Sequence, residues 1–327
     1  MNWVITGGCG FIGRNLIHYL RQNEDCAIRV IDNLTVGSRE YLEMVTSFTE
    51  REKSTTSRGF PNTGQVELVV DDILEADNAL DHVKGADVIV HLAANTGVGP
   101  SVEDPRHDCV TNVIGTFNYL EAARQNDVKR FILASSGAPL GEVTPPIHEE
   151  KAPHPKSPYG ASKLAGEGYC SAYYGSFGVE TVALRFGNVY GPFSSHKSSV
   201  VAKFIRRALE SKTLEIYGDG SQTRDFIFTE DLVKAISQAV TVSDIGGEIF
   251  QIATNKETTV LELTDLLVGQ LKKVGIGDIE VKHISPRTGD VQRNYSDTSK
   301  AKKILNWENE FKLKQGLSET LAWFLKN

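Results

Sequence analysis

The stretch TGGCGFIG at residues 6–13 decides the fold of this chain. It follows a short apolar run at residues 2–5 and opens a segment in which apolar side chains recur at helical spacing. Glycine has no β-carbon, so the backbone here can turn tightly and approach a pyrophosphate, which would sit on the exposed N–H groups of a helix N-terminus. The GxxGxxG spacing therefore predicts a dinucleotide-binding loop, with the contact residues Gly7, Gly10, Phe11, Ile12 and Gly13.

An acidic residue follows this loop at the distance that the interpretation requires. A second apolar run, at residues 28–31, is followed directly by Asp32. A carboxylate there can accept hydrogen bonds from the ribose hydroxyls of adenosine, and it would repel a 2′-phosphate. We therefore expect NAD rather than NADP as the cofactor; a tight turn packed for structural reasons alone is the alternative.

Short β-branched runs alternate with segments of helical period through the first half of the chain. The runs lie at residues 4–5, 28–31, 66–70, 88–90, 130–133 and 181–184. Continuously apolar strands are typical of parallel sheets covered on both faces, so the alternation predicts an α/β fold with a Rossmann-like doubly wound parallel sheet. The polar stretch at residues 49–64, which contains Gly and Pro and has no period, is expected to be a surface loop.

The spacing of the helical patterns becomes irregular beyond about Asn188. The later patterns lie at residues 200–209, 232–240, 260–272 and 317–325. We expect an NAD-binding Rossmann domain at residues 1–187, with a return segment near 225–255, and a smaller α/β lobe at 188–327 that mainly binds the substrate.

Composition excludes several classes of function. The chain has 327 residues, of which 40% are hydrophobic and 24% charged, as in globular proteins. A net charge of −7 leaves no broad positive field for nucleic acid. Apolar runs are too short for a membrane span, and no basic signal region precedes them, so we expect a cytoplasmic protein. The four cysteines and eight histidines lack metal-ligand spacing, so no metal is expected.

Tyr159 and Lys163 lie four residues apart in a segment of helical period, which puts both on one helix face. An ammonium group stabilises a nearby phenolate and, with a cationic nicotinamide, would lower the tyrosine pKa from about 10. Tyr159 is therefore the predicted general base. Ser136 follows the run at 130–133, at the sheet edge where ligands of this architecture bind, and can contact the same substrate oxygen. A solvated helical pair and a serine that caps the strand end are the structural alternatives.

These motifs are part of an ordered series along almost the whole chain. In this series of motifs the sequence resembles the extended short-chain dehydrogenase/reductases of the nucleotide-sugar epimerase and dehydratase group, and among these it is close to the UDP-glucose 4-epimerases. The series also includes Asp32-Asn33-Leu34, Asp71-Asp72-Ile73, His91-Leu-Ala-Ala94, Asn112-Val-Ile-Gly-Thr116, Ser135-Ser136, Arg185-Phe-Gly-Asn-Val-Tyr-Gly-Pro192, Tyr217-Gly-Asp-Gly-Ser-Gln-Thr-Arg-Asp225 and Arg287-Thr-Gly-Asp290.

The resemblance implies further contacts with the cofactor. Asp72 and Ile73 would border the adenine, and Asn112 would support the helix at the active site. The remaining residues implied to line the cofactor cleft are Asn33, Leu92, Ala93, Ala94, Ser135, Tyr159 and Lys163.

The resemblance also implies a UDP-sugar as the substrate. Asn188 would hold the sugar nucleotide, and Tyr217 would flank the uracil. Arg224 and Arg287 would bind the diphosphate, to which arginines make charge-assisted hydrogen bonds, and Asp290 would bind the uridine ribose. For the arginines the alternative is a surface ion pair, and for Tyr217 a core aromatic. The implied substrate set is completed by Thr96, Ser136, Lys197 and Asn294.

The reaction depends on the residues after the catalytic serine. Dehydratases of the group resemble one another in an Asp–Glu pair there, and decarboxylases have a glutamate, whereas this chain has Gly137 and Ala138. Neither side chain transfers a proton, so a 4-keto sugar would only receive its hydride back. The resemblance thus implies C4 epimerisation with tightly bound NAD. A dehydratase, a UDP-glucuronate decarboxylase or epimerase, and an NAD-binding regulator without chemistry stay as alternatives.

Two departures concern the sugar. Asn294 stands where glucose-restricted relatives have a bulky tyrosine, so UDP-GlcNAc/UDP-GalNAc and UDP-Glc/UDP-Gal are equally expected substrate pairs. Pro139-Leu140-Gly141 replaces the Val-Tyr-Gly of many members, so the loop there can differ in shape. Helices near residues 103–124 and 157–174 resemble those of a four-helix dimer interface, which implies a homodimer.

Overall fold

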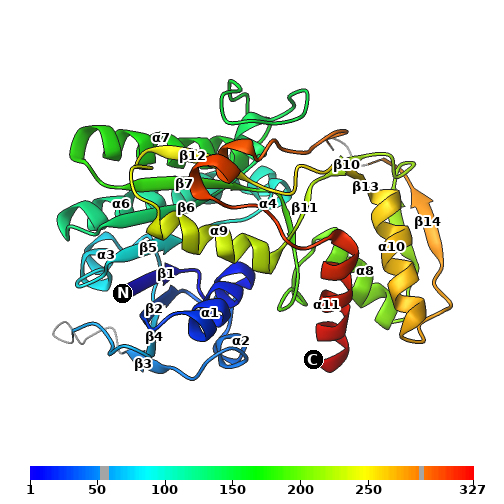
Figure 1. The fold of residues 1–327 in the computed structure, drawn as a ribbon, viewed down its shortest axis with the longest axis horizontal. Helices are drawn as coiled ribbons and strands as arrows, with labels where there is room; N and C mark the ends of the chain where they lie inside the picture. The colour runs from blue at the N-terminus through cyan, green and yellow to red at the C-terminus, as the bar shows by residue number, and fades with distance from the viewer. Residues whose placement is uncertain (52–58, 287–290) are drawn as a thin grey trace. The chain divides into compact units, whose positions relative to one another are not determined.

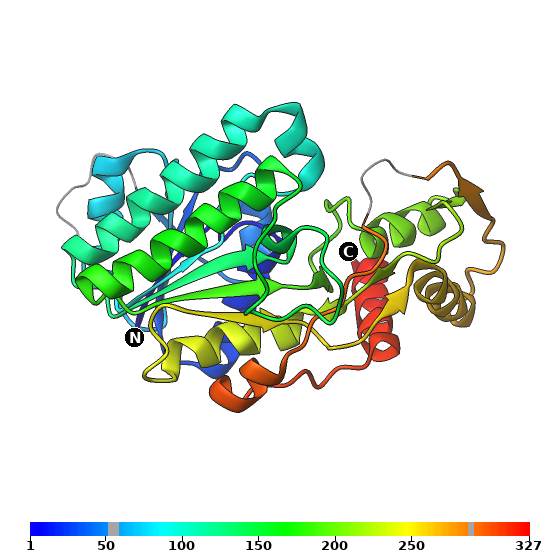
Figure 2. The same ribbon diagram turned by 90° about the horizontal axis from the view of Figure 1, so that it is seen from above.

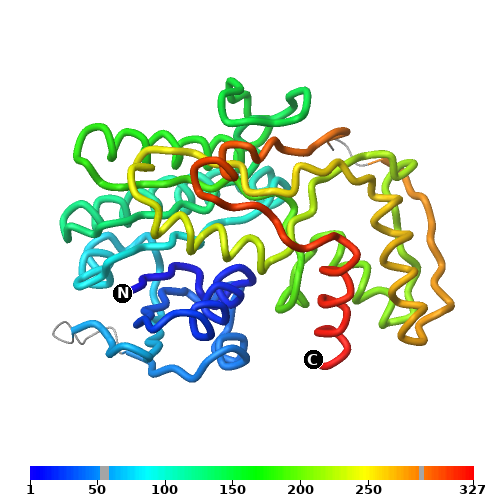
Figure 3. The backbone as a smooth tube through the Cα atoms, viewed as in Figure 1, coloured from blue at the N-terminus to red at the C-terminus, as the bar shows by residue number. Residues whose placement is uncertain are grey.

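The computed structural model describes residues 1–51, 59–286 and 291–327, and the chain divides into two compact units. The first unit comprises Met1–Glu142, Glu149–Arg185 and Val233–Phe250. The second comprises Val143–His148, Phe186–Leu232 and Gln251–Asn327. The chain thus leaves the first unit twice, after Glu142 and after Arg185, and returns to it each time; Figure 3 traces the backbone by residue number.

An eight-stranded sheet runs through the first unit, in the order β12-β7-β6-β5-β1-β2-β4-β3 (Figure 1). The order reverses direction at β1, since β2 pairs with one side of it and β5 with the other, both in parallel. The strands are β1 (Asn2–Thr6), β2 (Ala27–Asp32), β3 (Thr49–Arg51), β4 (Val66–Val70), β5 (Val88–His91), β6 (Arg130–Ser136), β7 (Thr181–Phe186) and β12 (Glu248–Ile252). The predicted Rossmann-like doubly wound parallel sheet is confirmed.

Helices cover both faces of this sheet (Figure 2). One face carries α3 (Ala76–His82), α6 (Gly115–Gln125) and α7 (Pro158–Phe177), whose apolar side chains pack on β1, β5 and β6 in one buried cluster. The other face carries α1 (Phe11–Asn23) and α9 (Thr229–Thr241). Burial on both faces explains why the central strands contain continuous apolar runs, such as residues 3–5 and 88–90, rather than alternating apolar and polar residues.

The second unit has its own core. Three helices, α8 (Val200–Leu209), α10 (Val260–Lys273) and α11 (Leu313–Lys326), confirm the helical patterns expected there. The core is formed by these helices together with short strands. The strand pairs are β8 (Asn188–Tyr190) with β11 (Phe226–Phe228), β9 (Leu214–Tyr217) with β14 (Val281–Ile284), and β10 (Thr223–Arg224) with β13 (Thr258–Thr259).

The prediction of a surface loop at residues 49–64 is wrong for its first three residues. Thr49–Arg51 form β3, which pairs with β4 at the sheet edge, and Arg39 holds it by two hydrogen bonds of 2.7 Å to Glu50. An edge strand is stabilised by backbone hydrogen bonds to one neighbour and need not bury both faces. Its sequence therefore need not show the apolar pattern by which strands are predicted. Residues 52–58 of the expected loop lie outside the described residues, and residues 59–64 are neither helix nor strand.

Within the described ranges, the structure contains no helix whose length and apolar character would suit a membrane crossing.

Candidate active site

The glycine loop joins β1 to α1 in a conformation that requires glycine. Gly7 has φ +70°, and a β-carbon on it would lie 2.8 Å from the backbone nitrogen of Ala93. At the start of α1, Gly10 provides no side-chain cap and the first turn holds no acidic residue. The N–H groups of this turn and the positive end of the helix dipole are therefore available to an anion, as a pyrophosphate requires.

Asp32 ends β2 beside this loop. Its Oδ2 accepts a hydrogen bond of 2.9 Å from the backbone N–H of Cys9, and its Oδ1 accepts one of 2.9 Å from that of Leu34. Burial raises the pKa of the Asp32 carboxyl, while these hydrogen bonds lower it. The next residue, Asn33, donates to Asp72 at 2.8 Å. The residues expected to bind adenosine are thus joined by hydrogen bonds at the carboxyl ends of β2 and β4.

The segment after β5 forms the other side of this region. The backbone N–H groups of Leu92 and Ala93 donate to the backbone oxygen and the hydroxyl of Thr6, at 3.1 and 3.2 Å. Asn112, buried in the π-turn η1 (Val110–Ile114), accepts from the backbone N–H of Asn95 at 2.8 Å and donates to its carbonyl at 3.0 Å. Asn112 therefore fixes the segment, which also carries Ala94 and the exposed Thr96, through its backbone.

Ile73 lies on the same sheet edge and is buried. A β-carbon on Gly115, at the start of α6, would lie 2.4 Å from Cδ1 of Ile73. The Ile73 side chain can therefore pack here only because residue 115 is glycine. The glycine loop, the carboxylate at β2 and these walls lie at the carboxyl ends of the strands, beside the point where the strand order reverses. That is where open α/β sheets bind nucleotides, and the residues present fit NAD.

Ser136, Tyr159 and Lys163 come together at the same edge of the sheet. Ser136 ends β6, and its hydroxyl is hydrogen-bonded to Tyr159, the second residue of α7. The Lys163 ammonium lies 6.0 Å from the centre of the Tyr159 ring and donates to the carbonyl of Ala134 at 2.9 Å. The predicted catalytic triad of side chains is therefore one cluster in the folded chain.

Burial shifts the pKa of both the Tyr159 phenol and the Lys163 amine, the first upward and the second downward. Burial raises the pKa of Tyr159 to about 12, and the hydrogen bond with Ser136 opposes the rise. Burial also lowers the pKa of Lys163 to about 8. Positive charge near the phenol oxygen, from Lys163 and from a bound cationic ring, is what would lower the pKa of Tyr159 toward neutrality.

The segment after Ser136 packs into the protein. Ala138–Leu140 form the short helix η2, and Pro139 and Leu140 are buried. A β-carbon on Gly160 of α7 would lie 2.5 Å from the Ala138 carbonyl oxygen, so close packing of the two segments requires glycine. Pro139 and Leu140, which replace the Val-Tyr of many family members, thus have buried side chains in the first unit.

Sequence reasoning missed a buried ion pair behind the cluster. Glu167, one turn after Lys163 on α7, accepts hydrogen bonds of 2.8 and 2.7 Å from Arg185, and both side chains are almost fully buried. Ser135, which was expected to contact the cofactor, donates its hydroxyl to Glu167 at 2.6 Å. The spacing of Tyr159, Lys163 and Glu167 on one helix face was the available signal.

The substrate residues expected in the second unit fall on its strands and loops. Arg224, on β10, donates to the carbonyls of Thr223 and Val291 at 2.7 and 2.6 Å. The backbone N–H of Asn294 donates to the Thr223 hydroxyl at 3.2 Å, so β10 holds the segment that carries Asn294. Two further expected residues, Arg287 and Asp290, lie outside the described residues.

Three more of the expected residues are accessible. Asn188 begins β8 and is exposed, and Tyr217 ends β9 with 38% of its surface exposed. Lys197 is half-buried, and burial lowers its pKa. Tyr217 is therefore a surface aromatic rather than part of the core, as stacking on a base would require.

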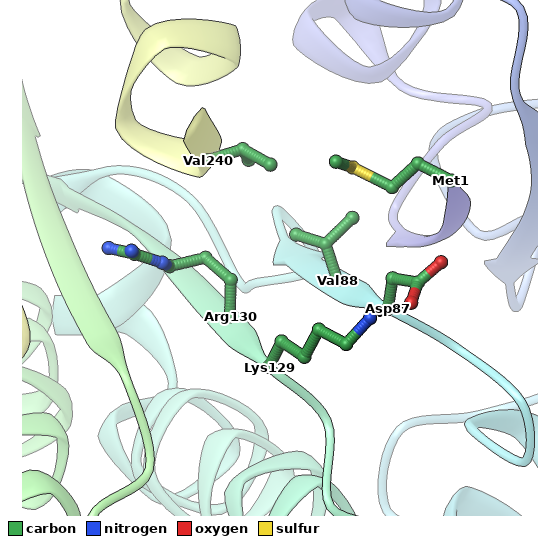
Figure 4. A pocket seen from close by; sticks show the side chains of 6 residues that line it. All are labelled: Met1, Asp87, Val88, Lys129, Arg130 and Val240. Carbon is green, nitrogen blue, oxygen red and sulfur yellow. Dashed lines mark hydrogen bonds and ion pairs between the residues drawn. The ribbon is translucent and has the colours of Figure 1, made fainter. Parts of the chain in front are cut away.

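A pocket of about 360 Å³ lies at the opposite edge of the sheet, where β5 and β6 begin (Figure 4). Lys129 and Asp87 form an ion pair of 2.8 Å in its wall. The side chains that line it are Met1, Asp87, Val88, Lys129, Arg130 and Val240. It contains none of the expected site residues and lies at the amino ends of the strands, where this architecture does not bind nucleotides.

Comparisons with known proteins agree with this geometry. The family described as NAD dependent epimerase/dehydratase matches residues 3–253 of this chain. A relative from Methanocaldococcus jannaschii, named a putative UDP-glucose 4-epimerase, is 36% identical over 331 residues, which cover 99% of this chain and 98% of the relative.

Two solved structures are similar over their whole length. The UDP-glucose 4-epimerase of Thermotoga maritima, solved with UDP-glucose, has a TM-score of 0.87 and 33% identity, covering 100% of this chain and 99% of that chain. The UDP-N-acetylglucosamine 4-epimerase of Methanobrevibacter ruminantium, solved with UDP-N-acetylmuramic acid, has a TM-score of 0.87 and 30% identity, covering 99% and 98%. Both similarities extend over the two units.

Proposed function

Because this chain belongs to the NAD-dependent epimerase/dehydratase family, we propose that it is an isomerase that inverts C4 of a UDP-hexose. The observation that carries the proposal is the cluster of Ser136, Tyr159 and Lys163, together with the absence of a proton-transferring side chain at Gly137 and Ala138. The cluster can start an oxidation at a carbinol, and nothing at those two positions can divert the ketone.

The residues have separate roles in this reaction. Tyr159 Oη removes the proton from the C4 hydroxyl and returns it after the sugar has turned its other face. Ser136 donates to the same sugar oxygen and holds it near Tyr159. Lys163 supplies the positive charge that favours the phenolate. NAD, bound at the glycine loop and Asp32, supplies a reversible hydride acceptor at C4.

The first unit would therefore bind NAD and carry the catalytic side chains. The second unit would bind the UDP part of the substrate through Asn188, Lys197, Tyr217 and Arg224. Arginine suits a diphosphate and an accessible aromatic ring suits a pyrimidine base, which supports this assignment. We include Arg287 and Asp290 in the same proposed set, and we propose that Thr96, which belongs to the first unit, borders the sugar.

We propose that the substrate pair is either UDP-Glc/UDP-Gal or UDP-GlcNAc/UDP-GalNAc. Asn294, on the segment that Thr223 and Arg224 hold, has a small side chain where a tyrosine would occupy more space. Relatives named for UDP-glucose and for UDP-N-acetylglucosamine are both similar to this chain, which supports either pair.

We also propose a cytoplasmic homodimer. The first unit exposes apolar side chains on neighbouring helical segments, among them Ile114 on η1 and Phe177 on α7, with 47% and 56% of their surfaces exposed. Large exposed apolar side chains on adjacent helices are typical of an interface. The four cysteines are free, as is typical of a reducing compartment. Light scattering tests the dimer.

The function is tested by NMR of the purified protein with UDP-Glc, UDP-GlcNAc and UDP-GlcA in turn, without added NAD. Appearance of the C4 epimer with one of the first two supports the proposal. A 4-keto-6-deoxy product or released carbon dioxide would instead indicate a dehydratase or a decarboxylase. Retention of NAD with no product from any of these sugars would favour the regulator.

A further inference from the structure

A buried carboxylate, Asp108, lies on the short helix α5 (Pro105–Cys109), which packs against α7. Asp108 is fully buried, and its Oδ1 accepts a hydrogen bond of 3.0 Å from Nδ2 of Asn112. Among the residues that the structure describes, its Oδ2 has no hydrogen-bond partner. A carboxylate in such a place is costly unless a positive charge lies nearby.

Asn112 connects Asp108 to the catalytic cluster. The same Nδ2 lies 3.0 Å from the hydroxyl of Ser162, which in turn donates to the backbone carbonyl of Tyr159 at 3.1 Å. Ser162 stands between Tyr159 and Lys163 in the sequence. Asp108 is therefore held against the turn of α7 that carries both groups.

Two buried carboxylates, Asp108 and Glu167, influence the charge of Lys163. The buried ammonium donates a hydrogen bond to the carbonyl of Ala134, which carries no net charge. Asp108 and then Glu167 are the carboxylates that raise the pKa of Lys163 against the effect of burial. Glu167 already accepts two hydrogen bonds from Arg185, so its charge is largely neutralised. Among the described residues, no cation forms an ion pair with Asp108.

The other groups that face this pair are neutral. Burial raises the pKa of the Cys170 thiol on α7, so the thiol stays protonated. Burial, followed by the charge of Lys163, lowers the pKa of His91 on β5 to about 3, so the imidazole stays uncharged. Ser136 on β6 contributes a hydroxyl only. On Tyr159 itself, Asp108 raises the pKa, in opposition to Ser136.

We propose that Asp108 is a positioning residue that keeps Lys163 protonated and thereby sets the pH range in which Tyr159 works. Its negative charge acts on Lys163 and directly on Tyr159, and in this proposal it touches neither sugar nor cofactor. The inference rests on the proposed function for its kinetic consequence, whereas the ionisation of Lys163 can be measured without it.

The kinetic test is Asp108→Asn, which removes the charge and keeps the shape. The acid and alkaline limbs of the pH profile of kcat/KM report the groups of the free enzyme. Without the carboxylate both Tyr159 and Lys163 lose protons more readily, so both limbs should move to lower pH, by about one unit. Glu103→Gln, an equal charge change at an exposed position nearby, should move neither limb. A purely structural role of Asp108 would lower activity at every pH and shift nothing, which would overturn the inference.

A second measurement does not depend on turnover. Because the Lys163 amine is buried and out of reach of a modifying reagent, its ionisation is followed by NMR of protein labelled with carbon-13 at the lysine ε-carbon, whose chemical shift across a pH series gives the midpoint at which the amine becomes neutral. Asp108→Asn and Asp108→Ser should both lower that midpoint by about one unit, and Glu103→Gln should not. An unchanged midpoint in the variants, or a wild-type midpoint below about 7, would contradict the inference. Absence of epimerase activity with a shifted midpoint would contradict only the proposed function.

Discussion

Glu167 accepts hydrogen bonds of 2.8 and 2.7 Å from Arg185, one helical turn beyond Lys163. The pair joins α7 to β7 inside the first unit, where neither side chain reaches water. Ser135 adds a third hydrogen bond to the same carboxylate from β6. The helix that carries the catalytic pair is therefore fixed to two strands by one buried ionic group.

Glu167→Gln should destabilise the protein strongly, because it leaves the Arg185 guanidinium buried without its counter-charge. We expect a loss of about 3–5 kcal/mol in the free energy of unfolding, measured by urea denaturation. Glu210→Gln, which breaks an exposed ion pair with Lys212, should cause no measurable change. If both substitutions changed the free energy of unfolding equally, burial of the Glu167–Arg185 ion pair would make no difference to its contribution to stability.

Tyr159→Phe should lower kcat by about 100-fold or more, because it removes the hydroxyl that is proposed to take the C4 proton. KM and the unfolding midpoint should change little, since the ring is retained. Tyr169→Phe, at an exposed position on the same helix, is the matched control and should keep wild-type turnover. Undiminished kcat in Tyr159→Phe would refute the proposed base.

Gly7→Ala should weaken NAD retention, because the residue has φ +70° and its β-carbon would lie 2.8 Å from the nitrogen of Ala93. NAD that remains after gel filtration, measured by absorbance of the released cofactor, should fall well below the wild-type amount. Gly168→Ala, on an exposed position of α7 with open space around it, should retain NAD and gain about 0.5–1 kcal/mol in stability. Full retention in Gly7→Ala would mean that the loop relaxes without harm.

Two buried histidines should make the protein sensitive to acid. Burial lowers the pKa of His82 to about 4 and that of His91 to about 3, against about 6.5 in an unfolded chain. The unfolded state therefore binds more protons below about pH 6.5, so the free energy of unfolding falls as the pH drops through this window. The slope should reach about 1.4 kcal/mol per pH unit for each histidine.

Urea unfolding of His91→Gln across the same window should show a smaller slope than the wild type. The exposed His107 provides the comparison, and His107→Gln should keep the wild-type slope. If His91→Gln unfolds with the full slope, the acid sensitivity comes from other groups.

The central sheet and most helices could be predicted because apolar periodicity reports burial directly. The helix expected near residues 103–124 is interrupted at Asp104, which caps α5 through its side chain before Pro105. That break has a local signal, an Asp–Pro step. Pairing at β3 has none, because backbone hydrogen bonds between strands distant in sequence leave no periodic trace.

The candidate site was predictable only in part, for a similar reason. Gly7, Tyr159 and Lys163 belong to local spacings, whereas the pairing of Glu167 with Arg185 depends on how α7 meets β7. Asp108 and Asn112 are four residues apart, a spacing typical of a helical contact. Spacing alone gives no indication that the carboxylate of Asp108 is buried, since an exposed pair has the same pattern.

Asp32 has a consequence for any attempt to change the cofactor. Both of its oxygens accept backbone N–H groups, one from the glycine loop at Cys9 and one from the turn at Leu34. A substitution meant to admit a phosphorylated ribose would also release these two segments. Redesign toward NADP would have to rebuild the anchor of the loop before it could alter selectivity.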